Sequence, residues 1–522
     1  MDNVQEKIIN SAEFQDFLSF AKQNKIENKE GQPYILLEGF LHVSRFVLLN
    51  TYLGILANKQ GYNVAFIAGS DGNTQCNIAY KALGAEPIYL SELQYKKSFI
   101  QKIISKLKRE LRKSLLQKDL TNLLNFKEGT VNIGAYVYDT VIRVTPNVFT
   151  ISQAQYQVVV EKLEQAVEVY YKYKSLLSAK NIKYIVLSHK FYINYGILGR
   201  VGIENGASIL SIFGGLIKEI KDEDFYMESD TKVTPEILER LYQLPKETIL
   251  NFISKRFSGE VLQHDVYYAY QTKREYEDTE VYLNLKLDKD KPIGLIMTHA
   301  FSDVPHCTGF SIYLDYYDWF VKTLELIKDI PQVQWLIKPH PASVLYEEVG
   351  VVEEVIKAFP HIQLVPNDIK PTSLFRISDA VVTVRGTAGA EALLFDNQII
   401  LAGASPYDSL GLTINCKNEQ GYKSTLSQIQ KKYKRTETEL YKAQCALYWI
   451  TSNASYSDDL IGSGMPPNLS NEVIFDTETN NYKQACHLLK MQDWQNHVFI
   501  KNINRIFLKN NSNSLSVFSP IA

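Results

Sequence analysis

The chain has 522 residues, more than one ordinary hydrophobic core accommodates, so two domains are expected. A hydrophobic fraction of 45% and a charged fraction of 22% are typical of globular proteins in water. Lys and Arg number 56 against 58 Asp and Glu, so the chain has no overall electric field that would recruit nucleic acid or a membrane. Nucleic acid is therefore excluded as an expected partner.

The cysteines and the N-terminal sequence indicate the cell compartment. The five cysteines are odd in number and form no CxxC pair, which argues against a disulfide framework and against a zinc cluster. The opening MDNVQEKIINSAEF lacks the basic region and apolar core of a signal peptide, and no apolar run is long enough to cross a bilayer. We expect a cytoplasmic protein, with peripheral association at the inner face of the cell membrane as an open alternative.

The first half of the chain alternates apolar, strand-like runs with helical patterns. PYILLEGF has the pattern of a buried strand, and Gly61 provides a stop for the helix that follows it. The predicted elements are strands at 33–40, 62–69, 183–188 and 207–214 and helices at 42–61, 94–127 and 189–206. A charged stretch, about residues 220–290, is predicted to form helices and a connection between domains.

A second alternating series begins at residue 293. It predicts strands at 293–300, 334–341, 362–366, 380–385 and 398–403, separated by helices at 313–330, 347–359, 372–378 and 388–396. Alternating strands and helices favour mainly parallel sheets, so the predicted fold class is α/β with two Rossmann-like doubly wound domains that face each other across a cleft. The expected boundaries are 1–285, 286–480 and a helical tail at 481–522. A ligand is expected in the cleft, because ligand sites favour domain interfaces.

The turn from Arg385 to Gly389 joins a predicted strand to a predicted helix. Free backbone N–H groups at such a turn suit a phosphate, and Gly386 and Gly389 allow a close approach, while Thr387 and Arg385 add donors. Glu391, in the first helical turn, can accept hydrogen bonds from a ribose or sugar hydroxyl. The alternative is structural: the acid complements the helix dipole and the glycines fit a tight turn.

Polar residues also follow two other strands of the second series. In IKPHP, Lys338 ends a strand, and His340 stands between two prolines that fix the loop; His340 and Pro341 are therefore predicted to contact a phosphate. In THAFSDVPH, His299 and Asp303 are candidate catalytic groups, with Asp303 the better nucleophile or general base. The spacing of His299, Asp303 and His306 provides no fourth ligand, so no metal is expected.

The first domain carries similar groups at its strand ends. SHKFYINYGILGR supplies His189, Tyr192 and Tyr195, and EGFLHVSR supplies Glu38 and His42. We expect them on the acceptor side of the cleft, with His189 a further catalytic candidate. A single histidine of this kind is more often structural, but two at equivalent strand ends favour a functional role.

Two further patterns are interpreted as surface features. DKD at Asp288–Asp290 has the form of a metal-binding DxD, but no apolar strand precedes it and it lies in a charged stretch. The helix at Lys102–Lys118 has Ile104, Leu107, Leu111 and Leu115 on one stripe among many cations. A solvated helix whose stripe packs on the domain is the favoured interpretation, and a helix lying on anionic lipid is the alternative.

The motifs of the second domain resemble a known family. KPHP, followed about forty residues later by VVTVRGTAGAEALLFDNQIILAGASPYDSLGL, is similar to the capsule polysaccharide biosynthesis family over residues 293–415. Its pattern is an HP pair, a valine-rich strand, a Ser/Thr-Gly turn, EAL, a buried strand and a closing Gly-x-x-x-Tyr, here Gly403 and Tyr407. The N-terminal LLEGFLH and the segment IGAYVYDTVIR look like related enzymes of cell-surface carbohydrate.

The resemblance implies a GT-B glycosyltransferase without a DxD metal and without a cofactor. The N-terminal domain would be the acceptor side, and the C-terminal domain would hold the nucleotide sugar, with CMP-Kdo as a family donor. His340 and the turn from Thr387 to Glu391 would hold the nucleotide, Tyr407 would close the motif, and Asp303 would be the catalytic acid. The expected partners are a nucleotide-sugar donor and a glycan or glycolipid acceptor.

Two other functions remain open. A sugar-nucleotide epimerase or a polyol-phosphate transferase would use the same fold, and the need for an acceptor or the choice of donor would distinguish them. A non-catalytic subunit of a carbohydrate-assembly complex would lack strand-end polar groups, whereas His340, Glu391 and Asp303 are all present.

Overall fold

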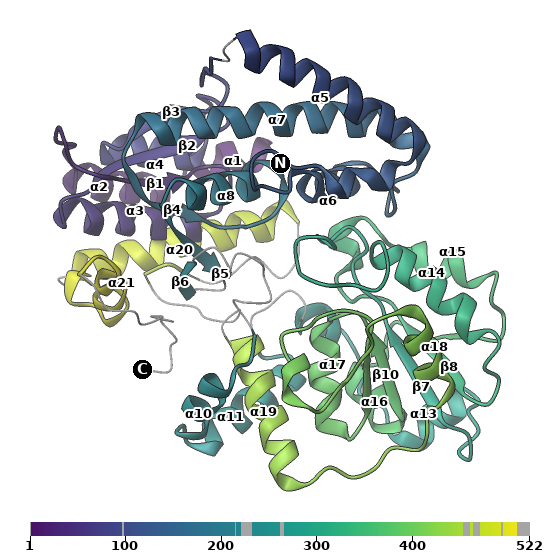
Figure 1. Ribbon diagram of the computed structural model, residues 1–522. Helices are drawn as coiled ribbons and strands as arrows, with labels where there is room; N and C mark the ends of the chain where they lie inside the picture. The colour runs from purple at the N-terminus through teal and green to yellow at the C-terminus, as the bar shows by residue number, and fades with distance from the viewer. Residues whose placement is uncertain are drawn as a thin grey trace. The chain divides into compact units, whose positions relative to one another are not determined.

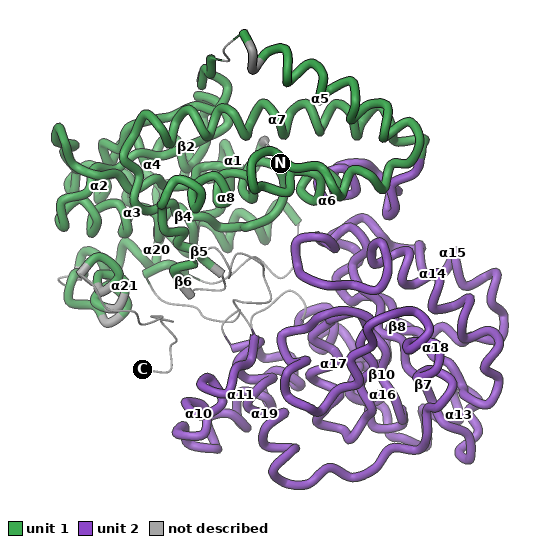
Figure 2. The backbone as a smooth tube through the Cα atoms, in the orientation of Figure 1, with its two compact units in different colours: residues 1–138, 153–225, 453–522 green, residues 139–152, 226–452 purple. Residues whose placement is uncertain are grey.

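The computed structural model describes residues 2–96, 99–213, 216–220, 232–261, 266–452, 460–462, 470–491 and 494–508 (Figure 1). The chain divides into two compact units, which Figure 2 shows in different colours. Unit 1 comprises residues 1–138, 153–225 and 453–522, and unit 2 comprises residues 139–152 and 226–452.

Unit 1 is built on a six-stranded sheet with the order β3-β2-β1-β4-β5-β6. Its strands are parallel except for the last pair, β5 and β6. The strands are β1 (Tyr34–Glu38), β2 (Asn63–Ala68), β3 (Glu86–Tyr89), β4 (Ile182–Leu187), β5 (Ser208–Phe213) and β6 (Leu216–Ile220). The helices are α1 (Asp2–Ile9), α2 (Ala12–Gln23), α3 (Ser44–Lys59), α4 (Gln75–Leu83), α5 (Phe99–Lys118), α7 (Tyr156–Ala179), α8 (Ile197–Glu204), α20 (Asn471–Met491) and α21 (Val498–Leu508). Helix α6 (Ile133–Val144) begins in unit 1 and belongs to unit 2 from Asp139 onward.

Unit 2 repeats this strand order in a wholly parallel sheet, β12-β11-β10-β7-β8-β9. The strands are β7 (Ile293–Met297), β8 (Gln334–Lys338), β9 (Gln363–Leu364), β10 (Ala380–Thr383), β11 (Gln398–Leu401) and β12 (Ile414–Asn415). The helices are α10 (Pro235–Tyr242), α11 (Lys246–Ser258), α13 (Asp278–Asn284), α14 (Tyr316–Ile327), α15 (Val351–Ile356), α16 (Pro371–Ile377), α17 (Thr387–Ala392), α18 (Glu419–Ser427) and α19 (Glu437–Ser452).

Both sheets have a doubly wound order, in which the first and fourth strands lie side by side. The connections that follow these two strands run in opposite directions along the sheet. The central strands are buried along almost their whole length, because helices cover a parallel sheet on both faces. The predicted α/β class with two Rossmann-like sheets is thus confirmed. The predicted cleft between the domains stays a prediction.

The two compact units have other boundaries than the domains expected from sequence. Helices α10 and α11 pack on α19, and α13 packs on α16, so residues 232–285 lie with unit 2 rather than with the N-terminal domain. The C-terminal helix α20 packs on α1, α2 and α3 of unit 1, rather than forming a separate tail. Its Tyr482 is fully buried and donates to Gln75 at 2.6 Å, and its Glu478 accepts from the Ser44 backbone N–H at 2.5 Å. These apolar and polar contacts explain why the chain returns to its first sheet.

Candidate functional site

The carboxyl ends of β7 and β10 lie next to each other in unit 2, at the point where the strand order reverses. In open α/β sheets this switch point is where ligands bind, because the connections leave it in opposite directions. The loop after β7 carries His299 and Asp303, and the loop after β10 carries Arg385 and Gly386. Two stretches that the sequence analysis selected separately are therefore brought together.

His299 links these two loops. Its Nε2 accepts from the Arg385 backbone N–H at 3.3 Å and lies 3.1 Å from the Thr383 hydroxyl, while its ring stacks on Tyr316 with centroids 4.3 Å apart. Burial, and then the positive charges of His340 and Arg385, hold the pKa of His299 well below its ordinary value. The ring is therefore neutral, with its proton on Nδ1, so it is suited to donating a hydrogen bond rather than to acting as an acid.

A pocket of about 490 Å³ lies beside this linkage. Its walls come from the ends of β7, β8 and β9, and they include Thr298, His299, His340, Pro341 and Asn367. A volume of this size falls within the range of about 300–1,000 Å³ that is usual for small-molecule sites. The loop after β8 is fixed to the loop after β7, because the His340 backbone N–H donates to the Thr298 hydroxyl at 2.8 Å.

Lys338 is buried below this pocket rather than being part of its wall. Its Nζ donates to the backbone carbonyls of Pro366 and Asn367 at 3.0 and 3.1 Å, which ties the end of β8 to the loop after β9. Burial, with the nearby charge of Lys273, lowers the pKa of Lys338 to about 7. Its amine therefore positions a wall of the pocket, whereas the sequence analysis expected a direct nucleotide contact.

The loop after β7 is held in a defined shape by a buried carboxylate. Glu348 accepts from the backbone N–H groups of Phe301 and Ser302, both at 2.8 Å, and from the Ser302 hydroxyl at 2.7 Å. Val304 has φ of 43°, in the left-handed region that a β-branched residue rarely adopts. Strain of this kind persists only where the surroundings enforce it, and it is frequent at functional sites.

Asp303 precedes the strained residue and lies in a mixed electrostatic environment. Burial raises the pKa of its carboxyl, a hydrogen bond with Tyr346 and the charge of Arg143 lower it, and the charge of Asp139 raises it, so that the pKa ends above its ordinary value. The Arg143 guanidinium lies over the Tyr346 ring, 4.8 Å from its centroid. The carboxyl is thus placed by a tyrosine and an arginine, as a general base or nucleophile must be.

The sequence analysis did not select Asp139, which is fully buried in α6. Asp139 Oδ1 lies 2.7 Å from His306 Nδ1, and its carboxylate also accepts from the His306 backbone N–H. A carboxylate at Nδ1 fixes the ring and leaves Nε2 as the acceptor nitrogen. The signal in the sequence was an acid within the apolar helix AYVYDTVI.

The turn from Arg385 to Gly389 has a structural explanation that differs from the predicted one. The Arg385 guanidinium donates to the backbone carbonyls of Thr308, Gly309 and Phe310, so it braces the chain that follows β7. A side chain at Gly389 would collide with the Tyr407 hydroxyl, which itself donates to the Gly386 carbonyl at 2.6 Å. The following helix α17 has only six residues. Thr387, at its start, is partly exposed.

Glu391 is buried in a charged cluster rather than directed to a ribose. Its carboxylate accepts from Arg256 Nε at 2.8 Å and from the Tyr270 hydroxyl at 2.6 Å, and the side chains of Arg256 and Glu391 are 1% and 5% exposed. The cluster joins α17 to α11, within unit 2. This geometry indicates a structural role for Glu391, because removing a carboxylate that neutralises a buried guanidinium is strongly destabilising.

The expected acceptor-side residues gather at the corresponding switch point of unit 1, between β1 and β4. Glu38 Oε1 accepts from the backbone N–H groups of Phe40 and Leu41 at 2.6 and 2.7 Å, and Oε2 accepts from the Ser188 hydroxyl and backbone N–H. Burial raises the pKa of Glu38, although these hydrogen bonds oppose the rise. Glu38 therefore joins the two strand-end loops and is itself buried.

The aromatic and histidine residues lie around this junction. The Tyr195 ring packs against Phe40 and His189, with centroids 5.4 and 5.3 Å apart, and burial lowers the pKa of His189. Burial also lowers the pKa of His42. Tyr192 has φ of 60°, so this loop, like that after β7, carries a strained residue. Unit 1 thus brings Tyr195 and His189 into contact beside Ser188, whose hydroxyl donates to Glu38.

Neither a group of metal ligands nor a membrane-spanning helix occurs among the described residues. In those parts of the chain, no three His, Cys, Asp or Glu side chains are grouped as a metal site would require. No helix within the described ranges combines the length and the apolar character that crossing a bilayer demands.

Residues 229–454 match a protein-family model that is described as Capsule polysaccharide biosynthesis protein. A search of curated proteins found no significant match.

Among solved structures, the KpsC β-Kdo 2,4 transferase of Thermosulfurimonas dismutans is 14% identical, with a TM-score of 0.33, over 51% of this chain and 80% of that chain. The UDP-GlcNAc 2-epimerase of Methanocaldococcus jannaschii is 10% identical, with a TM-score of 0.27, over 80% and 99%. A glycosyltransferase of Rickettsia africae is 10% identical, with a TM-score of 0.25, over 88% and 100%. The fold assignment rests on the strand orders given above, which make each unit a Rossmann-like doubly wound sheet.

Proposed function

We propose that this chain, whose residues 229–454 belong to the capsule polysaccharide biosynthesis family, is a glycosyltransferase that moves a sugar from a nucleotide-activated donor to a surface polysaccharide or glycolipid. The observation that carries the proposal is the convergence of His299 and the His340 loop at the carboxyl edge of β7 and β8, beside a pocket of about 490 Å³. This edge lies within the matched residues.

The donor nucleotide is assigned to the pocket of unit 2. The neutral His299 ring carries an N–H donor at Nδ1. His340 lies between two prolines on a rigid loop, and both histidines line the pocket. Donors fixed in this way stabilise the charge that develops on a leaving phosphate, because they need no reorganisation during the reaction. His299 is therefore proposed as a phosphate contact, in place of the catalytic role expected from sequence.

Asp303 is proposed as the catalytic carboxylate of the same site. Its raised pKa and its contacts with Tyr346 and Arg143 suit a group that takes a proton from an acceptor hydroxyl or attacks the sugar. His306, whose ring is oriented by Asp139, is the second candidate for the base. The residues of unit 1 around Glu38 and Ser188, including His189, are proposed to contact the acceptor.

The finer features of the reaction follow from the family resemblance. A CMP-activated sugar, with CMP-Kdo as the first to test, is the proposed donor. We further propose that the transfer needs no divalent metal and takes place in the cytoplasm. An epimerase or a polyol-phosphate transferase is the second proposal on this fold, and a non-catalytic assembly subunit is the third. Acceptor-dependent release of nucleotide would separate the two transferases from the epimerase and the assembly subunit, and the donor used would separate the glycosyltransferase from the polyol-phosphate transferase.

Calorimetric titration with CMP, CDP and UDP tests the donor site. We expect CMP to bind the wild-type protein, and His340→Ala to weaken binding about tenfold or more, because a hydrogen bond to a charged phosphate is lost. His361→Ala is the matched control, since His361 is exposed in the same unit. His361→Ala should bind CMP with wild-type affinity, and both variants should keep the melting temperature of the wild type.

The alternatives predict other results of this titration. A preference for CDP or UDP would keep the site and replace the donor. Absence of nucleotide binding would contradict the proposal and favour the assembly subunit, and equal losses in His340→Ala and His361→Ala would contradict the assignment of the pocket.

A further inference from the structure

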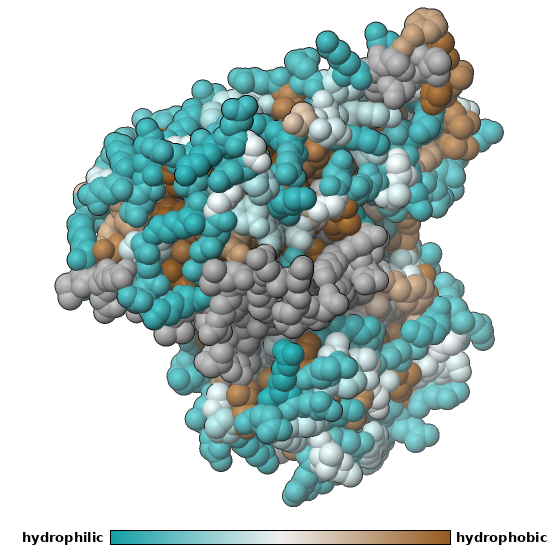
Figure 3. Space-filling model, turned by 60° about the vertical axis from the view of Figure 1, so that its left-hand side comes forward, coloured by the Kyte–Doolittle hydropathy of each residue, from teal (hydrophilic) through white to brown (hydrophobic). Residues whose placement is uncertain are grey.

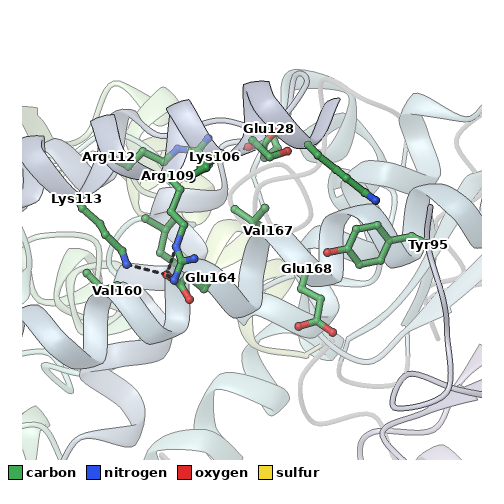
Figure 4. A pocket seen from close by; sticks show the side chains of 13 residues that line it. Tyr95, Lys106, Arg109, Arg112, Lys113, Glu128, Val160, Glu164, Val167 and Glu168 are labelled. Atoms are coloured by element: carbon green, nitrogen blue, oxygen red, sulfur yellow. Dashed lines mark hydrogen bonds and ion pairs between the residues drawn. The ribbon is translucent and has the colours of Figure 1, made fainter. Parts of the chain in front are cut away.

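The long helix α5 of unit 1 turns its charged side toward the domain. Arg109 Nη2 lies 2.6 Å from Glu164 Oε1 of α7, and Lys113 Nζ lies 3.2 Å from the same oxygen. Figure 4 shows these two side chains directed at Glu164. Burial raises the pKa of Glu164, but hydrogen bonds from Lys113 and Arg109 outweigh it and lower that pKa below its ordinary value. The contact with α7 is therefore ionic.

The same inward side of α5 makes a second ionic contact. Arg112 Nη1 lies 2.8 Å from Glu128 Oε1, and Lys108 Nζ lies 3.5 Å from Glu128 Oε2. Between α5 and α7 lies a pocket of about 380 Å³ lined by charged side chains of both helices, together with Tyr95, Val160 and Val167 (Figure 4). A helix that packs by its hydrophobic face would show the reverse arrangement.

Five apolar side chains of α5 are exposed as a consequence, whereas Leu116 is buried. Phe99 is 78% exposed, Leu107 67% and Leu111 61%, while Ile103 and Ile104 are 46% and 47% exposed. Phe99, Ile103, Leu107 and Leu111 recur every four residues, so they form one stripe along the helix. Apolar surface is visible at the upper right of Figure 3, where α5 begins. The structure thus contradicts the interpretation, favoured from sequence, that the stripe packs on the domain.

The charges of α5 indicate what covers this stripe. The helix carries seven cations, Lys102, Lys106, Lys108, Arg109, Arg112, Lys113 and Lys118, against a single acid, Glu110. At 3.6 residues per turn, Lys102 and Lys106 border one edge of the stripe together with Glu110, while Lys108, on the other edge, lies 3.5 Å from Glu128. A second copy placed on this face would bring cations against cations, whereas lipid phosphates would oppose them with negative charge.

We infer that α5 docks unit 1 on the surface of an anionic lipid bilayer. The stripe from Phe99 to Leu111 enters the boundary between headgroups and acyl chains, and Lys102 and Lys106 lie against lipid phosphates. This combination of an exposed apolar stripe with flanking cations is what interfacial helices use to lie in the plane of a membrane. The inference is independent of the reaction proposed for unit 2.

Co-sedimentation of the full chain with vesicles tests this inference. We expect binding to vesicles of phosphatidylglycerol and phosphatidylcholine in equal parts, and at least tenfold weaker binding to phosphatidylcholine alone. Leu107→Glu with Leu111→Glu should reduce binding to the anionic vesicles at least tenfold. Both residues are already exposed, so the fold should be retained, as the melting temperature would show. Leu283→Glu is the matched control, because Leu283 is 76% exposed on α13 of unit 2 and should bind as the wild type does.

A separate variant tests the contribution of the lysines to vesicle binding. Lys102→Glu with Lys106→Glu should weaken binding to anionic vesicles and leave little dependence on salt. Equal binding of the wild type and the Leu107→Glu, Leu111→Glu variant would overturn the inference, as would a lack of binding to anionic vesicles. A wild-type dimer in light scattering that this variant dissociates, without vesicle binding, would assign the stripe to a second copy of the chain.

Discussion

Replacing Asp303 with Asn should lower the turnover of sugar transfer about a thousandfold while changing CMP binding by no more than a few fold. A positioned base contributes about 10²–10⁴ to the rate, and Asn keeps the shape of Asp without its charge or basicity. The fold should be unaffected, because burial and the neighbouring Asp139 already raise the pKa of this carboxyl. The measurement is release of nucleotide from a CMP-activated sugar in the presence of acceptor.

The pH dependence of the same assay identifies the group. The Asp303 carboxylate is the active form, so turnover should fall as pH decreases through a pKa above the ordinary value of an aspartate. In Asp303→Asn the residual turnover should no longer fall as the pH decreases through this range. Asp288→Asn, at an exposed position, is the control and should behave as the wild type. Wild-type turnover in Asp303→Asn, with a large loss in His306→Gln, would transfer the role of base to His306.

The second large effect is expected on stability rather than on catalysis. Glu391→Ala should lower the free energy of unfolding of unit 2 by about 3–5 kcal/mol, because it leaves the Arg256 guanidinium buried without its carboxylate. For a domain of this size, such a loss corresponds to a fall of roughly 10 °C in the melting temperature. Thermal unfolding followed by circular dichroism measures it.

Two further variants make this stability prediction specific. Glu325→Ala removes an exposed acid of the same unit and should change the unfolding free energy by less than about 0.5 kcal/mol. Arg256→Met combined with Glu391→Gln should recover part of the loss, since Gln still accepts from the Tyr270 hydroxyl. An unchanged melting temperature with lost CMP binding in Glu391→Ala would instead restore the ribose contact expected from sequence.

The sheets could be predicted because buried parallel strands leave continuous apolar runs, as in NVAFIA of β2 and IGLIM of β7. Strands without such runs were missed: β3 reads EPIY, with a proline, and β12 has two residues. The C-terminal helices were assigned to a tail because their spacing indicates a buried face but gives no information about which sheet the face meets. That face lies against α2 and α3, more than 400 residues earlier in the sequence.

The candidate site stays a prediction, and sequence could indicate its strand-end residues better than their contacts. Strand ends are recognisable from local sequence, and parallel strands bring them to one edge, so the approach of His299 and the His340 loop was foreseeable. The partners of a polar side chain are not local. Glu391 meets Arg256 at a separation of 135 residues, and Asp139 meets His306 at 167. Sequence spacing alone therefore could not distinguish a ribose contact from a buried ion pair.

Helix α5 illustrates a third limit. Its periodicity shows a stripe and a charged side, but not which of them faces the protein. The acids Glu128 and Glu164, which draw the cations inward, come from the segment before α6 and from α7. Their positions became clear only in three dimensions.

The measurement that tests the central assignment most directly is hydrogen–deuterium exchange of the full chain with and without saturating CMP. The account predicts slower exchange of backbone amides in residues 298–306, 338–346 and 364–368, which form and support the pocket of unit 2. Slower exchange confined to residues 38–44 and 188–197 of unit 1 would contradict it, because the donor would then lie on the side assigned to the acceptor.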